Sequence, residues 1–246
     1  MSIYLAELVS IQMEQIRQEG SEASPIVYAL PRGGIPVAVP VARKLGCPLD
    51  VITAKKITVP TNRELAIGAI TSENHILLAE HKQLKSISLR QLEEAIEEAQ
   101  LKASRQQAQF APYRPSVTPQ GKIAILIDDG IATGMTIRVA AQAIKEKKVA
   151  RLWLCAPVAP PTLIPQLELE CGLGFAEARS GRVVVAATPS PFRSVGLFYE
   201  RFEQVATQEA ARELQQYNHQ LNSHAKFDLS STNNPIIAKV SGLLPQ

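Results

Sequence analysis

The chain has 246 residues, of which 46% are hydrophobic and 20% charged, with a formal net charge of +3 at pH 7. This length accommodates one large α/β domain or two small ones, and the composition is that of an ordinary globular protein. No apolar run approaches the roughly 18 residues that span a bilayer, and no basic stripe typical of nucleic-acid binding is present. We therefore expect neither a membrane nor a nucleic acid as a partner.

The N-terminal segment 1–20 is predicted to form an amphipathic helix. Glu7 and Glu14 lie among its apolar residues, which is not the pattern of a signal peptide. The cysteines form no C-x-x-C pair, and we expect buried thiols in the reducing cytoplasm. They are Cys47, Cys155 and Cys171. The four histidines lie in polar stretches and are predicted to be surface residues.

Apolar segments alternate with amphipathic ones between residues 24 and 189. The predicted strands are 24–30, 48–57, 122–127, 150–159 and 182–189, with further apolar segments at 65–71 and 75–80 after a polar stretch at 58–64. The predicted helices are 35–46, 88–110 and 135–148, with a helical turn or two at 160–170. A glycine ends the first of these helices, and a serine caps the second. Strands rich in Val, Ile and Leu that alternate with helices are typical of a parallel sheet covered on both faces.

We therefore predict a single α/β domain, with a mostly parallel twisted sheet, over residues 1–206, including the N-terminal helix. Residues 207–246 are predicted to be a helical extension, with a helix at 208–220. The residues after 220 are polar and turn-rich, and we expect a loosely held tail there.

Residues that suit a binding site gather in the segment 125–136, ILIDDGIATGMT. Ligands of parallel α/β sheets bind beyond the carboxyl ends of the strands, where Asp128 and Asp129 are placed. Small residues and threonines follow, so that backbone N–H groups and hydroxyls can surround a phosphate at the start of the next helix. The two carboxylates repel a phosphate but suit hydroxyl groups or a divalent cation. The expected ligand is a sugar phosphate.

Other phosphate-binding motifs do not match. The segment contains no Gly-Lys-Ser/Thr, as a nucleotide P-loop would, and the dinucleotide-binding G-x-G-x-x-G is absent. A receiver domain also ends a strand in paired acids, but the order of the elements differs here.

The segment ILIDDGIATGMT resembles the phosphoribosyl-pyrophosphate signature of type I phosphoribosyltransferases: apolar residues, two acids, three variable positions, then Thr-Gly-x-Thr. A bacterial group of these proteins, whose acceptor is generally unassigned, is similar from about residue 25 to 206. The similar segments are YALPRGG, PLDVITAKKI, ELAIGAI and TPSPFRSVGLFYERF. The resemblance implies the type I phosphoribosyltransferase fold.

The resemblance also implies roles for the signature residues. Asp128 and Asp129 would bind the ribose 2′- and 3′-hydroxyls, and would contact Mg²⁺ indirectly, through water or the ligand. The following loop would bind the 5′-phosphate. Its residues are Ala132, Thr133, Gly134, Met135 and Thr136.

Two other segments would bind the leaving pyrophosphate. The PRGG turn supplies Arg32, Gly33 and Gly34, and the second strand supplies Lys55 and Lys56. Adjacent strand residues point in opposite directions, so one lysine faces the pyrophosphate and the other is a solvated charge. Lys56 matches the family position better and, with Arg32, is the predicted catalytic cation.

Arg63 and Glu64 would lie in the mobile loop that closes over the site, although a surface role is at least as well supported.

The implied reaction is displacement of Mg²⁺-pyrophosphate by a nitrogen nucleophile. Purine-salvage members carry an acid at the third variable position, where this chain has Ala132, so a 6-oxopurine acceptor loses support. Phe192 and Tyr199 are the best candidates among the aromatic residues of 188–202 to form the acceptor hood, while core packing suits the others.

The main alternative is a regulatory protein that senses phosphoribosyl pyrophosphate on the same fold without catalysis. A phosphatase or synthase acting on sugar phosphates would need additional acids or histidines near the loop, which are absent. The family commonly forms homodimers, but no interface is readable from the sequence.

Overall fold

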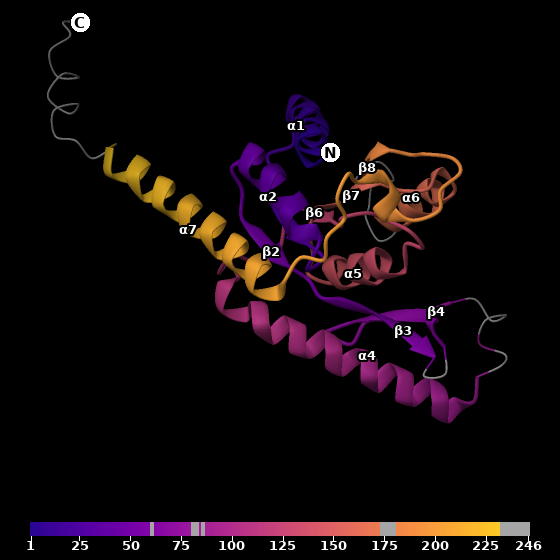
Figure 1. Cartoon of the computed structure of the whole chain (residues 1–246). Helices are drawn as coiled ribbons and strands as arrows, with labels where there is room; N and C mark the ends of the chain where they lie inside the picture. The colour runs from indigo at the N-terminus through magenta and orange to yellow at the C-terminus, as the bar shows by residue number, and fades with distance from the viewer. Residues whose placement is uncertain (60–61, 80–83, 85–86, 173–180, 232–246) are drawn as a thin grey trace, which may run out of the picture.

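The structure is a computed structural model that describes residues 1–59, 62–79, 84, 87–172 and 181–231, without the side chains of 63–64 and 224–231 (Figure 1). Five strands form a wholly parallel sheet in the order β2-β1-β6-β7-β8. They are β1 (Pro25–Ala29), β2 (Leu49–Val51), β6 (Ile123–Ile127), β7 (Arg151–Val158) and β8 (Arg182–Ala187).

Helices cover both faces of this sheet, as predicted. The helices α1 (Ser2–Gln18), α2 (Gly34–Leu45) and α7 (Thr207–Ser231) contribute to one face, and α5 (Met135–Lys145) and α6 (Ile164–Gly172) to the other (Figure 1). Successive strand residues alternate between the two cores: Val27 and Ile125 pack in the first, and Tyr28 and Leu126 in the second. This burial on both faces explains why the strands are apolar without alternation.

A second, antiparallel sheet of three strands was not predicted. It contains β3 (Ala54–Val59), β4 (Asn62–Thr71) and β5 (Ile76–Leu78), and the long helix α4 (Leu89–Phe110) packs against it (Figure 1). The prediction of one strand at 48–57 is therefore wrong. Thr53 separates β2 from β3, because its hydroxyl donates to the carbonyl of Ala103 in α4 and its carbonyl accepts from Ser72.

The predicted polar loop at 58–64 is also mostly strand. Thr58 and Val59 end β3, and Asn62, Arg63 and Glu64 begin β4, so that the chain forms a hairpin here. The closing role of Arg63 and Glu64 stays a prediction, since their side chains lie outside the described part of the chain.

Short 3₁₀ helices complete the described fold at Ala111–Tyr113, Pro161–Leu163 and Val195–Phe198. The predicted helix ends are confirmed in two cases. Ser88 caps α4 by accepting a hydrogen bond from the Gln91 amide, and Gly46 ends α2 with a left-handed φ of 61°.

The helix α7 continues to Ser231, so the prediction of a loose tail from residue 221 is wrong up to that point. Leu214 and Tyr217 of α7 are buried in the same core as α1 and α2, and no glycine or proline interrupts 221–231. The domain boundary at residue 206 stays a prediction, and the predicted tail at 232–246 lies outside the described residues.

All three cysteines are buried free thiols, as predicted. His75 is not the surface residue that was predicted: its side chain is 16% exposed and lies 2.8 Å from a Glu146 carboxylate oxygen. His219 is exposed, whereas the side chains of His81 and His224 lie outside the described part. None of the described helices combines the length and apolar character needed to cross a membrane.

Candidate functional site

The candidate site lies where two neighbouring parallel strands end. Ala29 of β1 pairs with Ile127 of β6. The PRGG turn begins two residues after Ala29, and the acid pair, Asp128 and Asp129, follows Ile127 directly. The order of strands in the sheet changes direction between β1 and β6, with β2 on one side and β7 and β8 on the other. A ligand of an open parallel sheet binds at such a switch point.

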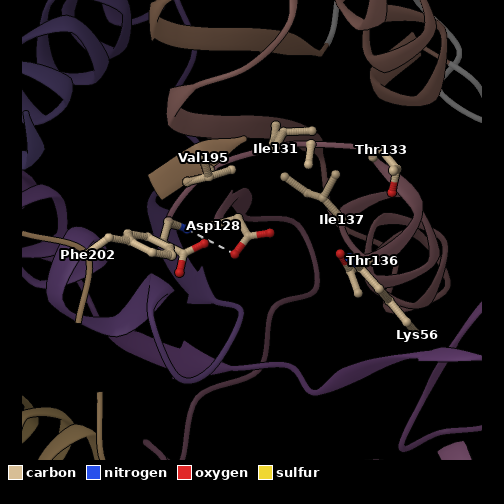
Figure 2. A pocket seen from close by; sticks show the side chains of 12 residues that line it. Lys56, Asp128, Ile131, Thr133, Thr136, Ile137, Val195 and Phe202 are labelled. Atoms are coloured by element: carbon tan, nitrogen blue, oxygen red, sulfur yellow. Dashed lines mark hydrogen bonds between the residues drawn. The ribbon is translucent and has the colours of Figure 1, made fainter. Parts of the chain in front are cut away.

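Asp128 and Asp129 stand at this point with partly buried side chains. The Asp129 amide donates a 2.9 Å hydrogen bond to the Asp128 carboxylate, drawn as the dashed line in Figure 2. Burial and the charge of Asp129 raise the pKa of Asp128 well above its usual value, although Lys56 acts in the opposite direction. Burial also raises the pKa of Asp129, against hydrogen bonds that lower it. Burial therefore outweighs the hydrogen bonds that favour the ionised form of each carboxyl.

The loop after the acid pair curves around a cavity of about 290 Å³ (Figure 2). Gly134 is the N-cap of α5 and has a φ of +74°, a backbone conformation that a glycine adopts without strain. The Ile131 amide donates to the Val158 carbonyl, which anchors the loop on β7. The cavity is lined by the acid pair, the loop and several neighbouring residues. They are Lys56, Asp128, Asp129, Gly130, Ile131, Ala132, Thr133, Gly134, Thr136, Ile137, Val195 and Phe202.

Of the predicted phosphate-binding loop, Ala132, Thr133, Gly134 and Thr136 thus line this cavity. The Met135 side chain instead packs against the core beneath α5. Only the backbone of Met135 is therefore placed to serve a phosphate.

The PRGG turn packs directly on the acid pair. A Cβ atom added at Gly33 would collide with the Asp129 carboxylate, and one at Gly34 would lie 2.9 Å from the Ile127 carbonyl oxygen. Glycine is needed at both positions for this close approach. The Pro31–Arg32 peptide bond is cis.

Arg32 does not line the acid-pair cavity. Its Nη1 donates a 3.3 Å hydrogen bond to Oγ1 of Thr207, the first residue of α7. The Arg32 side chain therefore points toward α7 and not into the cavity beside the loop 130–136. The catalytic role predicted for Arg32 stays a prediction.

The two lysines of β3 occupy different surroundings. Lys56 lines the cavity and lies toward its threonine end in Figure 2. Lys55 does not line the cavity and is partly buried, which corrects the expectation of a solvated charge. Burial lowers the pKa of Lys55, and the positive charges of Arg32 and Lys102 lower it further. Burial and the two nearby cations thus disfavour the charged form of Lys55, and its predicted role at the pyrophosphate stays a prediction.

The two aromatic residues predicted for the acceptor hood have different surroundings, and Tyr199 lines the cavity beside the acid pair. Their role toward an acceptor stays a prediction. Phe192 stacks on Phe198 with ring centroids 5.4 Å apart and lines neither the acid-pair cavity nor the one beside it. The Tyr199 hydroxyl donates a 2.5 Å hydrogen bond to the Asp129 carbonyl, and its ring contacts Phe202. Phe202 lines both cavities, which sequence reasoning missed although it noted this aromatic segment.

The described side chains contain no group of three or more His, Cys, Asp or Glu residues that could hold a metal ion by themselves. Two adjacent carboxylates fit a Mg²⁺ ion that arrives with a diphosphate ligand and is held partly by the oxygens of that ligand. Asp128 and Asp129 are the residues that would approach it, through water or the ligand.

We expect Gly33→Ala to weaken binding at the acid pair by about tenfold or more, because the added methyl group displaces the Asp129 carboxylate. The carboxylate can swing aside, so the melting temperature should change little. Calorimetric titration with phosphoribosyl pyrophosphate and a melting curve measure the two effects. Gly172→Ala is the matched control, because its Cβ would meet no atom of the described residues within 4 Å. Equal binding by both variants would contradict the packing argument.

The raised pKa of Asp128 also makes a prediction for stability. The folded chain holds the proton of the Asp128 carboxyl to higher pH than the unfolded chain does. The contribution of this carboxyl to the stability of the fold therefore falls as pH rises above about 3.9. Asp128→Asn should therefore raise the melting temperature at pH 7 and change it little at pH 4. Melting curves at both pH values test this, and a decrease at pH 7 would contradict it.

Comparisons with known proteins agree on one protein family. The family model described as the phosphoribosyl transferase domain matches residues 5–166. Two curated proteins of Mycobacterium tuberculosis, from strains CDC 1551 / Oshkosh and H37Rv, are named provisionally as phosphoribosyl transferases. Each is 34% identical over 200 residues, which cover 80% of this chain and 43% of the relative. The matched region is thus less than half the length of these relatives.

A crystal structure of a protein from Thermus thermophilus superposes with a TM-score of 0.65 and 29% sequence identity. The match covers 88% of this chain and 95% of that protein. This chain therefore shares its architecture of sheet and helices with a solved structure over nearly the full length of that structure. The family match covers most of the chain and contains both the PRGG turn and the acid-pair loop. This chain belongs to the phosphoribosyl transferase domain family.

Proposed function

We propose that this chain is a Mg²⁺-dependent phosphoribosyltransferase that moves the 5-phosphoribosyl group of phosphoribosyl pyrophosphate to a nitrogen acceptor and releases pyrophosphate. The acceptor is nucleobase-like but not a typical 6-oxopurine. One observation carries the proposal: the acid pair, the threonine loop and Lys56 line the same cavity of about 290 Å³. Family membership supports the same reaction.

The cavity offers separate partners for the two polar parts of a ribose phosphate. Asp128 and Asp129 are acceptors for the vicinal hydroxyls, and each hydroxyl-to-carboxylate bond is typically short and strong. Thr133, Thr136 and the backbone amides at the start of α5 donate to the phosphate, where the helix dipole favours a negative charge. Together these groups would fix the sugar so that its anomeric carbon faces the acceptor.

The leaving pyrophosphate needs positive charge as it departs. Lys56 lines the cavity, and the glycines of the PRGG turn allow the backbone to approach the ligand closely. Arg32 would join them by exchanging its hydrogen bond with Thr207 for the pyrophosphate. A Mg²⁺ ion bound with the substrate would neutralise part of the charge on the pyrophosphate oxygens.

Pyrophosphate release tests the proposal. Phosphoribosyl pyrophosphate and Mg²⁺ are incubated with the protein and a panel of purines, pyrimidines, pyridine carboxylates and simple amines. Release that depends on one acceptor supports the transferase. Tight calorimetric binding of phosphoribosyl pyrophosphate without release for any acceptor would instead favour the sensor alternative.

A further inference from the structure

An apolar slot stands beside the acid pair, at the opposite end of the cavity from Thr136 and Lys56 (Figure 2). Val195 forms one side of the slot: its methyl groups occupy the space that a side chain at Gly130 would take. Phe202 lines the same end of the cavity, and 48% of this residue is exposed. An exposed aromatic ring and a branched aliphatic side chain at one end of a cavity offer a flat ring an apolar surface to stack on.

Tyr199 links the Phe202 ring to the backbone of Asp129. The Tyr199 hydroxyl donates a 2.5 Å hydrogen bond to the Asp129 carbonyl, and the rings of Tyr199 and Phe202 lie 5.2 Å apart. Phe202 also lines the adjoining cavity of about 310 Å³. A ring in the slot would therefore lie next to the sugar that Asp128 and Asp129 bind.

Ionisable groups around the slot are few. Among the described residues that line the acid-pair cavity, the only ones are Lys56, Asp128 and Asp129. The carboxylates are assigned to the sugar, and Lys56 is a cation. Ala132 contributes only a methyl group. Glu203 is exposed and lines the adjoining cavity but not the acid-pair cavity. An acceptor that must lose a proton as it attacks finds no dedicated base in the described slot.

We propose that the acceptor is a planar heteroaromatic compound whose attacking ring nitrogen has a lone pair and no hydrogen, as in pyridine. The inference rests on the proposed phosphoribosyl transfer. The lone pair of the nitrogen forms the bond to the anomeric carbon, and the bond from that carbon to pyrophosphate breaks, with its electron pair leaving on pyrophosphate. No proton is transferred in this step. The ring of the product is a cation that lies beside the carboxylates of Asp128 and Asp129.

The test is pyrophosphate release with two classes of acceptor. Pyridine-3-carboxylate and pyridine-3-carboxamide carry the free ring nitrogen, whereas hypoxanthine, orotate and aniline must lose an N–H proton. N-Methylated pyridine-3-carboxylate is the blocked control. We expect release with the pyridines alone. Binding of phosphoribosyl pyrophosphate is measured in parallel by calorimetry.

Two pairs of variants test the slot. Phe202→Leu should raise the KM for the pyridine acceptor about three- to tenfold and leave the affinity for phosphoribosyl pyrophosphate within about twofold, because only ring stacking is lost. Phe192→Leu is the matched control, since that ring lines neither cavity. Glu203→Gln should leave kcat unchanged, with Glu200→Gln as its control.

The outcomes separate this inference from the proposed function. Release with hypoxanthine, orotate or aniline, or loss of kcat in Glu203→Gln alone, would overturn the acceptor class and leave the transferase proposal in place. Binding of phosphoribosyl pyrophosphate without release for any acceptor would overturn both.

Discussion

Replacing both acids, Asp128→Asn with Asp129→Asn, is expected to abolish measurable binding of phosphoribosyl pyrophosphate while the fold is retained. Each carboxylate would accept a hydrogen bond from a ribose hydroxyl, and hydrogen bonds to charged groups contribute about 1.5–3 kcal/mol each. Loss of both corresponds to about 10²–10⁴-fold in affinity. The raised pKa of each acid shows that burial penalises these charges in the free protein, so the amides do not threaten folding.

Isothermal titration calorimetry with Mg²⁺ present measures this loss, and circular dichroism checks the fold. Glu200→Gln is the control, because Glu200 is exposed and lines neither cavity. Unchanged affinity in the double variant would disprove the assignment of the acid pair to the sugar.

The second large effect is expected for Lys56→Ala. Lys56 is the only lysine or arginine among the described residues that line the acid-pair cavity. Removing one charge contact to a developing anion typically costs about 10²–10³ in rate. The substrate keeps its contacts to the acid pair and the threonine loop, so we expect affinity to fall by less than about tenfold.

Single-turnover kinetics and calorimetry on the same variant separate the two effects. Lys44→Ala is the matched control, since Lys44 is exposed on α2 and pairs with Glu7. Equal losses in kcat and affinity would show that Lys56 binds the ground state instead of the leaving group.

The signature loop could be predicted because its parts are contiguous in the sequence. An apolar strand, two acids and a loop of small residues specify their own relative positions once β6 lies in a parallel sheet. The PRGG turn follows the neighbouring strand, so the sheet alone brings Gly33 onto Asp129.

The slot could not be predicted in the same way. Val195 and Phe202 reach the cavity because the segment after β8 folds back over Gly130 and Asp129. This return depends on the Tyr199 hydrogen bond and on the missing side chain at Gly130, and neither leaves a periodic pattern in the sequence. The aromatic composition of the segment was visible, but the choice of Phe202 over Phe192 required the structure.

The second sheet was missed for a related reason. The segment 48–57 is largely apolar and rich in β-branched residues, so its pattern gives no sign that β2 and β3 belong to different sheets. The break comes from contacts of Thr53 with Ala103 and Ser72, which are distant in the sequence. The same change of sheet places Lys56 in the cavity and leaves Lys55 partly buried near Arg32.

Mass spectrometry of the reaction product tests transfer most directly. The protein is incubated with phosphoribosyl pyrophosphate, Mg²⁺ and pyridine-3-carboxylate, and the mixture is searched for a species whose mass is the acceptor plus one phosphoribosyl group. We expect this species with the unchanged protein and none with the variant that carries Asp128→Asn and Asp129→Asn. Formation of ribose phosphate alone, or of no product with any acceptor of the panel, would contradict phosphoribosyl transfer by this chain.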